Sequence, residues 1–146
     1  MPLVDSNVWL ALALSKHKFH SAAKSWLAKQ SAREPALFCR LTQLSFLRLL
    51  TTEAILAPYA THAMRNKAAW SLYESFLSDE RIDFVDEPRA LESSWKTLAA
   101  TRHVSPKLWT DAYLAAFAIA GKYQFVTTDK GFKQFKGLEL LVLSNA

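Results

Sequence analysis

Three aspartates, Asp5, Asp111 and Asp129, stand out in this sequence because their side chains and settings suit a shared chemical function. Carboxylate oxygens are the ligands that Mg²⁺ and Mn²⁺ prefer in proteins, and three carboxylates held together repel one another unless a divalent cation neutralises them. A cation held in this way activates a water molecule and stabilises charge on a transferring phosphoryl group. The three aspartates therefore suggest metal-assisted phosphate chemistry, provided that the fold brings them together.

Two of these aspartates follow predicted strands. Asp5 comes directly after the short apolar run 2–4, and Asp129 lies just beyond a strand predicted over 124–127. In open parallel sheets, ligands bind beyond the carboxyl ends of the strands. We therefore expect both carboxylates at the same edge of a sheet, although nearly the whole chain separates them.

Asp111 lies near the start of a helix predicted over 107–120. Apart from Tyr113 and Lys122, the segment 112–122 carries no polar side chain, and a helix that is apolar on every side is buried. A carboxylate in its first turn needs a compensating partner. The positive end of the helix dipole supplies part of that compensation, and a cation can supply the rest.

Each aspartate also has an ordinary explanation when it is taken alone. An aspartate after a strand is usually a turn residue or a helix cap, and Asp129 is followed by Lys130 and Gly131, as in a turn. Asp111 alone fits a residue that stabilises a helix dipole. Periodicity does not show that the three side chains meet, so their convergence is a hypothesis.

Short apolar runs alternate with segments of helical periodicity along the chain. Strands are predicted over 2–4, 36–39, 82–85, 124–127 and 140–143, and helices over 7–14, 19–30, 42–50, 61–77, 88–100 and 107–120. This alternation predicts an α/β fold with a mainly parallel sheet, and the apolar strands indicate that helices cover both of its faces. We expect three α/β/α layers around a mostly parallel sheet of four or five short strands.

The composition is that of an ordinary globular protein, 51% apolar and 21% charged, and 146 residues fit a single domain over 1–146. Cys39 is the only cysteine, which excludes an intramolecular disulfide and is typical of a reducing compartment. The longest apolar stretch, 112–120, is far shorter than the roughly 20 residues of a membrane helix, and residues 1–5 do not resemble a secretory signal. We therefore expect a cytoplasmic protein with no membrane partner, while the net charge of +5 weakly favours a polyanionic one.

Each aspartate belongs to a short motif. Residues 4–8 read VDSNV, residues 109–115 read WTDAYLA, and residues 126–132 read VTTDKGF. In this order and spacing they resemble the D-x-N, D-A-x-L-A and T-x-D motifs of the PIN-domain family. The resemblance covers nearly the whole chain, and it is closest to the VapC-type ribonuclease toxins of type II toxin–antitoxin systems.

This resemblance implies a role for each motif. Asp5, Asp111 and Asp129 would be the ligands of Mg²⁺ or Mn²⁺, with Asn7 and Thr127 orienting the carboxylates or a metal-bound water. The implied reaction is hydrolysis of an RNA phosphodiester. The implied partner is a cognate antitoxin protein, one segment of which fills the site, and the large apolar helices near the N-terminus are compatible with antitoxin docking or a homodimer.

One position departs from the family pattern. Many PIN domains carry a glutamate early in the helix after the second strand, where this sequence has Gln43. Because an amide brings no charge, a second metal ion should bind less tightly, and we assign Gln43 to the lining of the site. Because of Gln43, an alternative function remains: a PIN-like module that has weakened catalysis and acts by binding RNA or protein. A phosphotransfer enzyme with Asp5 as nucleophile is a further alternative, although enzymes of the haloacid-dehalogenase type carry a second aspartate where this chain has Asn7.

Aromatic and basic residues near the motifs are candidates for contacts to nucleic acid. Trp9 and Trp109 flank presumed site residues and are candidates for stacking on a base. Seven cationic side chains are candidates for a rim that grips phosphates, although solvation at the surface is the usual role of each one: Arg40, Arg48, Arg65, Lys67, Lys130, Lys133 and Lys136. His17 and His20 have the spacing of a metal pair, but without a third ligand we expect them to be structural or exposed.

Overall fold

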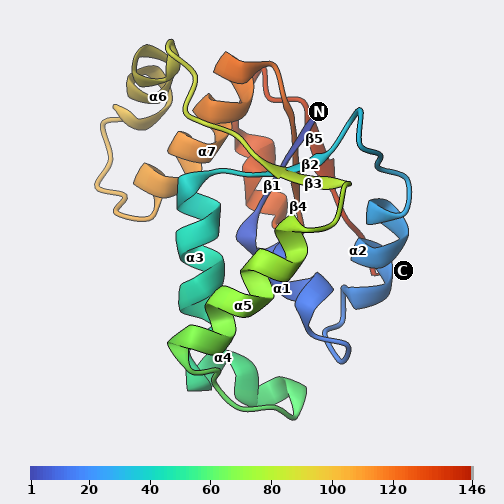
Figure 1. Cartoon of the computed structure of the whole chain (residues 1–146). Helices are drawn as coiled ribbons and strands as arrows, with labels where there is room; N and C mark the ends of the chain where they lie inside the picture. The colour runs from blue at the N-terminus through green and yellow to red at the C-terminus, as the bar shows by residue number, and fades with distance from the viewer. Residues whose placement is uncertain (146) are drawn as a thin grey trace.

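The computed structural model describes residues 1–145 and contains a five-stranded, all-parallel sheet with helices on both faces (Figure 1). The strand order is β3-β2-β1-β4-β5, so β1 is central. The strands are β1 (Pro2–Val4), β2 (Ala36–Phe38), β3 (Ile82–Phe84), β4 (Gln124–Thr127) and β5 (Leu140–Val142). The helices are α1 (Ser6–Ala13), α2 (His20–Leu27), α3 (Arg40–Leu50), α4 (Glu53–Leu56), η1 (Ala57–Tyr59), α5 (Asn66–Leu77), α6 (Leu91–Ala99), α7 (Leu108–Gly121) and η2 (Lys130–Gln134). The predicted α/β fold with a mostly parallel sheet is confirmed.

The strands divide their side chains between two hydrophobic cores, because successive residues of a strand point to opposite faces. Leu3, Leu37 and Phe125, which are paired in register, enter a core shared with α6 and α7. The next residues along the same strands, Val4, Phe38 and Val126, enter a core shared with α1, α2, α3 and α5. Helices of both layers are thus packed against the strands whose ends carry the aspartates.

The helix α1 is buried over most of its surface, and Trp9 fixes its start against the end of β1. The Trp9 indole stacks on Phe38 with ring centroids 3.9 Å apart, and its Nε1–H donates to the Val4 carbonyl oxygen at 3.1 Å. The side chain is fully buried, so the expectation that Trp9 stacks on a base is wrong. Trp9 instead holds the backbone on both sides of Asp5.

The C-terminal end of α7 depends on a glycine for reasons of space. A Cβ atom at Gly121 would overlap the ring of Tyr123, so a larger residue there requires the ring to move. The left-handed residue that ends the helix is Lys122, at φ 58°, although glycine is the usual residue in this conformation. The tight turn brings the chain directly from α7 into β4.

Several helix boundaries differ from the sequence prediction. Helix α3 begins two residues before the predicted Thr42, whose hydroxyl oxygen accepts a hydrogen bond from the Cys39 N–H at 2.9 Å. The segment 51–65 contains α4 and η1, which were not predicted. The left-handed Ala60 and a hydrogen bond from the Met64 N–H to the Leu50 carbonyl oxygen delay α5 to Asn66. Among residues 1–145, no helix combines the length and apolar character that crossing a membrane requires.

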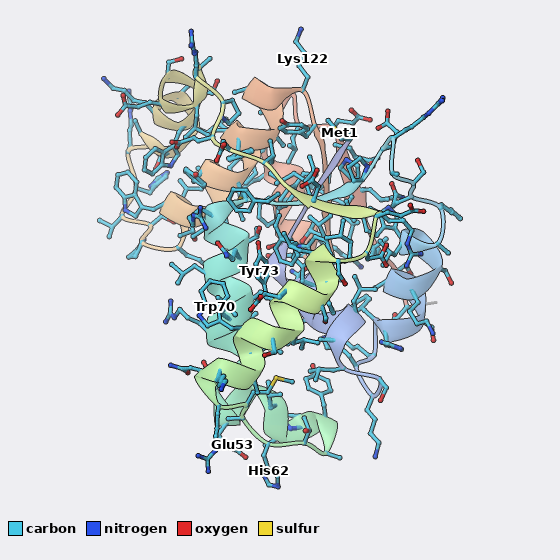
Figure 2. All side chains as sticks on the ribbon, viewed as in Figure 1. Met1, Glu53, His62, Trp70, Tyr73 and Lys122 are labelled. Atoms are coloured by element: carbon cyan, nitrogen blue, oxygen red, sulfur yellow. The ribbon has the colours of Figure 1, made fainter. Side chains whose placement is uncertain are left out.

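We predict that Trp9→Leu lowers the free energy of unfolding by at least about 2 kcal/mol, because it empties part of a closed core and removes the hydrogen bond to Val4. Trp70→Leu is the matched control, since Trp70 is 48% exposed on the outer side of α5 (Figure 2) and should cost less than about 1 kcal/mol. Equilibrium unfolding in urea measures both. Equal losses in the two variants would contradict the role given to Trp9.

Candidate metal centre

Asp5 is the buried member of the three aspartates. It follows β1 directly and caps α1, where its Oδ1 accepts the Ser6 N–H at 2.8 Å. Its own N–H donates to the Val126 carbonyl oxygen at 2.9 Å, which continues the β1–β4 pairing by one residue. The residue is 7% exposed. The carboxylate is thus fixed by backbone contacts at the carboxyl edge of the sheet.

Thr127 and Asn7 bind this carboxylate from the neighbouring strand and from α1. The Thr127 hydroxyl donates to Oδ2 of Asp5 at 2.7 Å, and the Asn7 amide donates to the same oxygen at 3.2 Å. The Thr127 oxygen also accepts the Asp129 N–H at 3.0 Å, while Oδ1 of Asn7 accepts the Thr128 N–H at 3.2 Å. One hydroxyl group therefore connects Asp5 to the backbone of Asp129.

Asp129 and Asp111 are half-buried and line a common cavity of about 360 Å³. Asp129 caps η2, with its Oδ1 accepting the Gly131 N–H at 2.8 Å. Glycine suits this position because a Cβ atom there would lie 3.0 Å from the same oxygen. Asp111 lies in the first turn of α7, as predicted.

The three negative charges act on one another. The pKa of Asp5 is raised from 3.8 to about 6, mainly by burial and to a smaller extent by the charges of Asp111 and Asp129, against the lowering effect of the hydrogen bonds from Thr127 and Ser6. The pKa of Asp111 is also raised, first by burial and then by Asp129, while Lys107 lowers it. The sheet edge therefore brings the three carboxylates into electrostatic contact.

The donor atoms fit a hydrated, hard divalent cation rather than a closed metal cage. Within residues 1–145, no three Asp, Glu, His or Cys side chains are grouped closely enough to hold a metal ion by themselves. Mg²⁺ does not need such a cage, since it usually keeps several waters and binds one or two carboxylates. Burial, with a smaller contribution from the neighbouring aspartates, disfavours the charged form of Asp5, and a nearby cation would favour that form.

Gln43 lies in the first turn of α3 and is 6% exposed, and its place in the lining of the site stays a prediction. Its amide oxygen accepts a hydrogen bond from Nη1 of Arg40, whose guanidinium lies over the Phe84 ring at 4.6 Å. Among the described residues, no hydrogen bond joins Gln43 to the aspartates. The positive charge of Arg40 beside this oxygen disfavours a cation at the same atom, although the oxygen keeps a second lone pair.

Part of the wall of this cavity was not predicted from the sequence. Besides the two aspartates, the loop before α7 lines the cavity with Thr101, His103, Ser105 and Lys107. This loop immediately precedes the WTDAYLA motif. Because a loop has no sequence periodicity, the residues whose side chains face the cavity could not be predicted. Trp109 is 58% exposed, and its stacking on a base stays a prediction.

Comparison with known proteins gives matches over nearly the whole chain. A family model described as PIN domain matches residues 3–138. The chain is 46% identical over 145 residues to Ribonuclease VapC41 of Mycobacterium tuberculosis, with 99% of each chain covered. It is 34% identical over 131 residues to Ribonuclease VapC44 of the same organism, covering 88% of this chain and 85% of that protein.

Solved structures show the same fold at low sequence identity. VapBC2 from Rickettsia felis, bound to a DNA fragment from its promoter, superposes with a TM-score of 0.67 at 13% identity over 98% of both chains. VapC20 of M. tuberculosis, a toxin that cleaves the sarcin-ricin loop, superposes with a TM-score of 0.64 at 19% identity, covering 95% of this chain and 98% of VapC20. The motifs, the parallel sheet and the family match agree, and the chain belongs to the PIN-domain family.

Proposed function

We propose that this protein is a metal-dependent endoribonuclease toxin of VapC type, which hydrolyses RNA phosphodiester bonds and is neutralised by a cognate antitoxin. The observation that carries the proposal is the Asp5 carboxylate, which Thr127 holds and whose pKa is raised first by burial and then by the charges of Asp111 and Asp129. The ribonuclease names of the relatives at 46% and 34% identity support the same reaction.

In this proposal Asp5, Asp111 and Asp129 hold Mg²⁺ or Mn²⁺. When bound, the cation lowers the pKa of a water molecule and stabilises charge on the phosphoryl group. The protein contributes orientation: Thr127 and Asn7 fix Oδ2 of Asp5, and backbone N–H groups fix Oδ1 of Asp5 and of Asp129. Outer contacts of this kind set the position and basicity of metal ligands.

An exposed apolar groove offers the antitoxin a place to bind. The groove measures about 340 Å³ and lies between the start of α3 and the helices α6 and α7, where Leu44 and Trp109 are more than half exposed. It also includes Thr110, the neighbour of Asp111. The similarity to VapBC2 supports a protein partner of this type. We further propose that the chain is a single PIN domain that works in the cytoplasm and can form a homodimer.

A catalytically weakened PIN module that binds RNA or protein is the second candidate. The observation that favours it is Gln43, an uncharged side chain whose oxygen is already bound by Arg40. The two candidates differ in one assay. The ribonuclease proposal requires the parent protein to cut a structured RNA in Mn²⁺ or Mg²⁺ and to stop when EDTA is added.

We predict that Asp5→Asn lowers the rate of metal-dependent RNA cleavage by at least about 100-fold while the protein stays folded, because the variant loses a ligand charge. Asp86→Asn is the matched control, since Asp86 is an exposed aspartate outside the site and should leave the rate unchanged. Cleavage of labelled RNA and a thermal unfolding curve measure the two properties. If Asp5→Asn cut RNA as fast as the parent, the assignment would be wrong.

We also predict that the metal-free protein loses stability as the pH rises. The folded-state pKa of Asp5, about 6, lies above the ordinary value of 3.8 for an aspartate in the unfolded chain, so the folded state binds this proton more tightly. The stabilisation is fully present below about pH 4 and is lost as the pH passes 6, amounting to about 3 kcal/mol.

Urea unfolding in EDTA, measured at several pH values, tests this. As the pH rises from 4 to 6, the parent should lose unfolding free energy relative to Asp5→Asn. Added Mn²⁺ should raise the unfolding free energy of the parent more than that of the variant. A difference that does not change with pH would show that the Asp5 carboxylate carries no such strain.

A further inference from the structure

We infer that single-stranded RNA is held in a basic and aromatic cleft that opens beside Asp129, an inference that rests on the proposed ribonuclease function. The cleft, which we call the lysine cleft, measures about 880 Å³. Its lysines are Lys18, Lys130 and Lys133, and its aromatic rings are His17, Phe19 and Tyr59. The loop between α1 and α2, the end of η1, η2 and residues 142–145 form its walls.

The lysine cleft adjoins the acidic edge. Asp129 lines both the lysine cleft and the smaller cavity that contains Asp111. A chain of phosphates that occupied the lysine cleft would therefore reach the carboxylates at one end. The smaller cavity, with Lys107 and His103 in its wall, would receive the strand on the far side of Asp129.

The cationic groups of the cleft come from separate segments that the fold brings together. Lys130 and Lys133 belong to η2, whereas Lys18 lies more than a hundred residues earlier in the sequence, and all three side chains are exposed. Of the cations suggested for a rim from the sequence, Lys130 and Lys133 line this cleft. Lys18 joins them, although nothing in its local sequence marked it.

Aromatic rings accompany the lysines, and this favours RNA over an acidic peptide. His17 and Tyr59 are stacked with ring centroids 4.8 Å apart at an interplanar angle of 19°, and Lys18 Nζ lies 5.3 Å from the centre of the Phe19 ring. Proteins that bind single strands without reading sequence combine a positive groove with aromatic rings on which bases stack. The carboxylates of an acidic peptide would pair with the lysines, but such a peptide has no bases to stack on the aromatic rings.

The test is equilibrium binding of a fluorescein-labelled oligouridylate of about twelve nucleotides, measured by anisotropy in EDTA so that cleavage cannot occur. The triple variant Lys18→Gln, Lys130→Gln, Lys133→Gln should bind roughly 10- to 100-fold more weakly at low salt. Its slope of log K against log salt should be shallower by about 2, because single strands release about 0.7 counterion per phosphate contact.

The matched control replaces three exposed lysines that line neither cavity, in the triple variant Lys24→Gln, Lys29→Gln, Lys96→Gln. It has the same net charge, so it should keep most of the parent affinity. The triple variant with arginine in place of the three cleft lysines should also bind the oligouridylate as the parent does. Equal losses in the cleft and control variants, or no detectable binding by the parent, would overturn the inference.

Tyr59→Leu separates stacking from charge. It should weaken oligouridylate binding about tenfold while leaving the salt slope unchanged, since base–aromatic contacts are not ionic. Polyglutamate of similar length should compete poorly with the RNA, and competition at equal strength would assign the cleft to acidic peptides instead. Because all these readouts use metal-free protein, loss of the cleft is distinguishable from loss of catalysis: a parent that binds RNA through the cleft but never cuts it would refute the proposed function alone.

Discussion

The hydrogen bond between the Thr127 hydroxyl and the Asp5 carboxylate is the contact on which the rest of the site depends. It joins residues 122 positions apart across β4 and the end of β1, and both partners are buried. The same carboxylate caps α1 and is repelled by the negative charges of two other aspartates. Burial and like charge disfavour its ionised form, whereas its hydrogen bonds favour that form. A carboxylate held between these opposing effects is prepared for a cation.

The fold supplies rigidity to this edge from both sides of the sheet. Asp5 begins α1, which is packed in one core, and Asp111 lies in the first turn of α7, which is packed in the other. Asp129 enters from the end of β4, next to the central strand. The acidic groups thus belong to elements that are fixed by separate cores, whereas the lysines around them lie on loops and on η2 at the surface.

Much of this site could be predicted from the sequence, for reasons that belong to particular residues. Asp5 and Asp129 could be assigned to one edge of the sheet because parallel strands end together. Asp111 could be added because a carboxylate in the first turn of a buried apolar helix needs a compensating partner. The supporting contacts of Asn7 and Thr127 were expected from the family motifs, and the structure places both against Asp5.

Other features depend on tertiary packing, which local patterns do not record. A helix that is apolar on every side gives no sign of which residue faces a strand, so the stacking of Trp9 on Phe38 and its hydrogen bond to Val4 could not be predicted from the sequence of α1. The pairing of Gln43 with Arg40 depends on side-chain conformation within α3 and on the ring of Phe84 in β3. Lys18 lies in a short loop, and its position beside η2 follows only from the way the two ends of the chain meet.

The most direct test of the account is calorimetric titration of Mn²⁺ into the RNA-free protein at neutral pH. The parent should bind the ion, and Asp5→Asn, Asp111→Asn and Asp129→Asn should each bind it at least about tenfold more weakly, since each removes one charge from a common site. Asp86→Asn should bind as the parent does. Unchanged Mn²⁺ affinity in all three site variants would contradict the claim that these carboxylates share a cation.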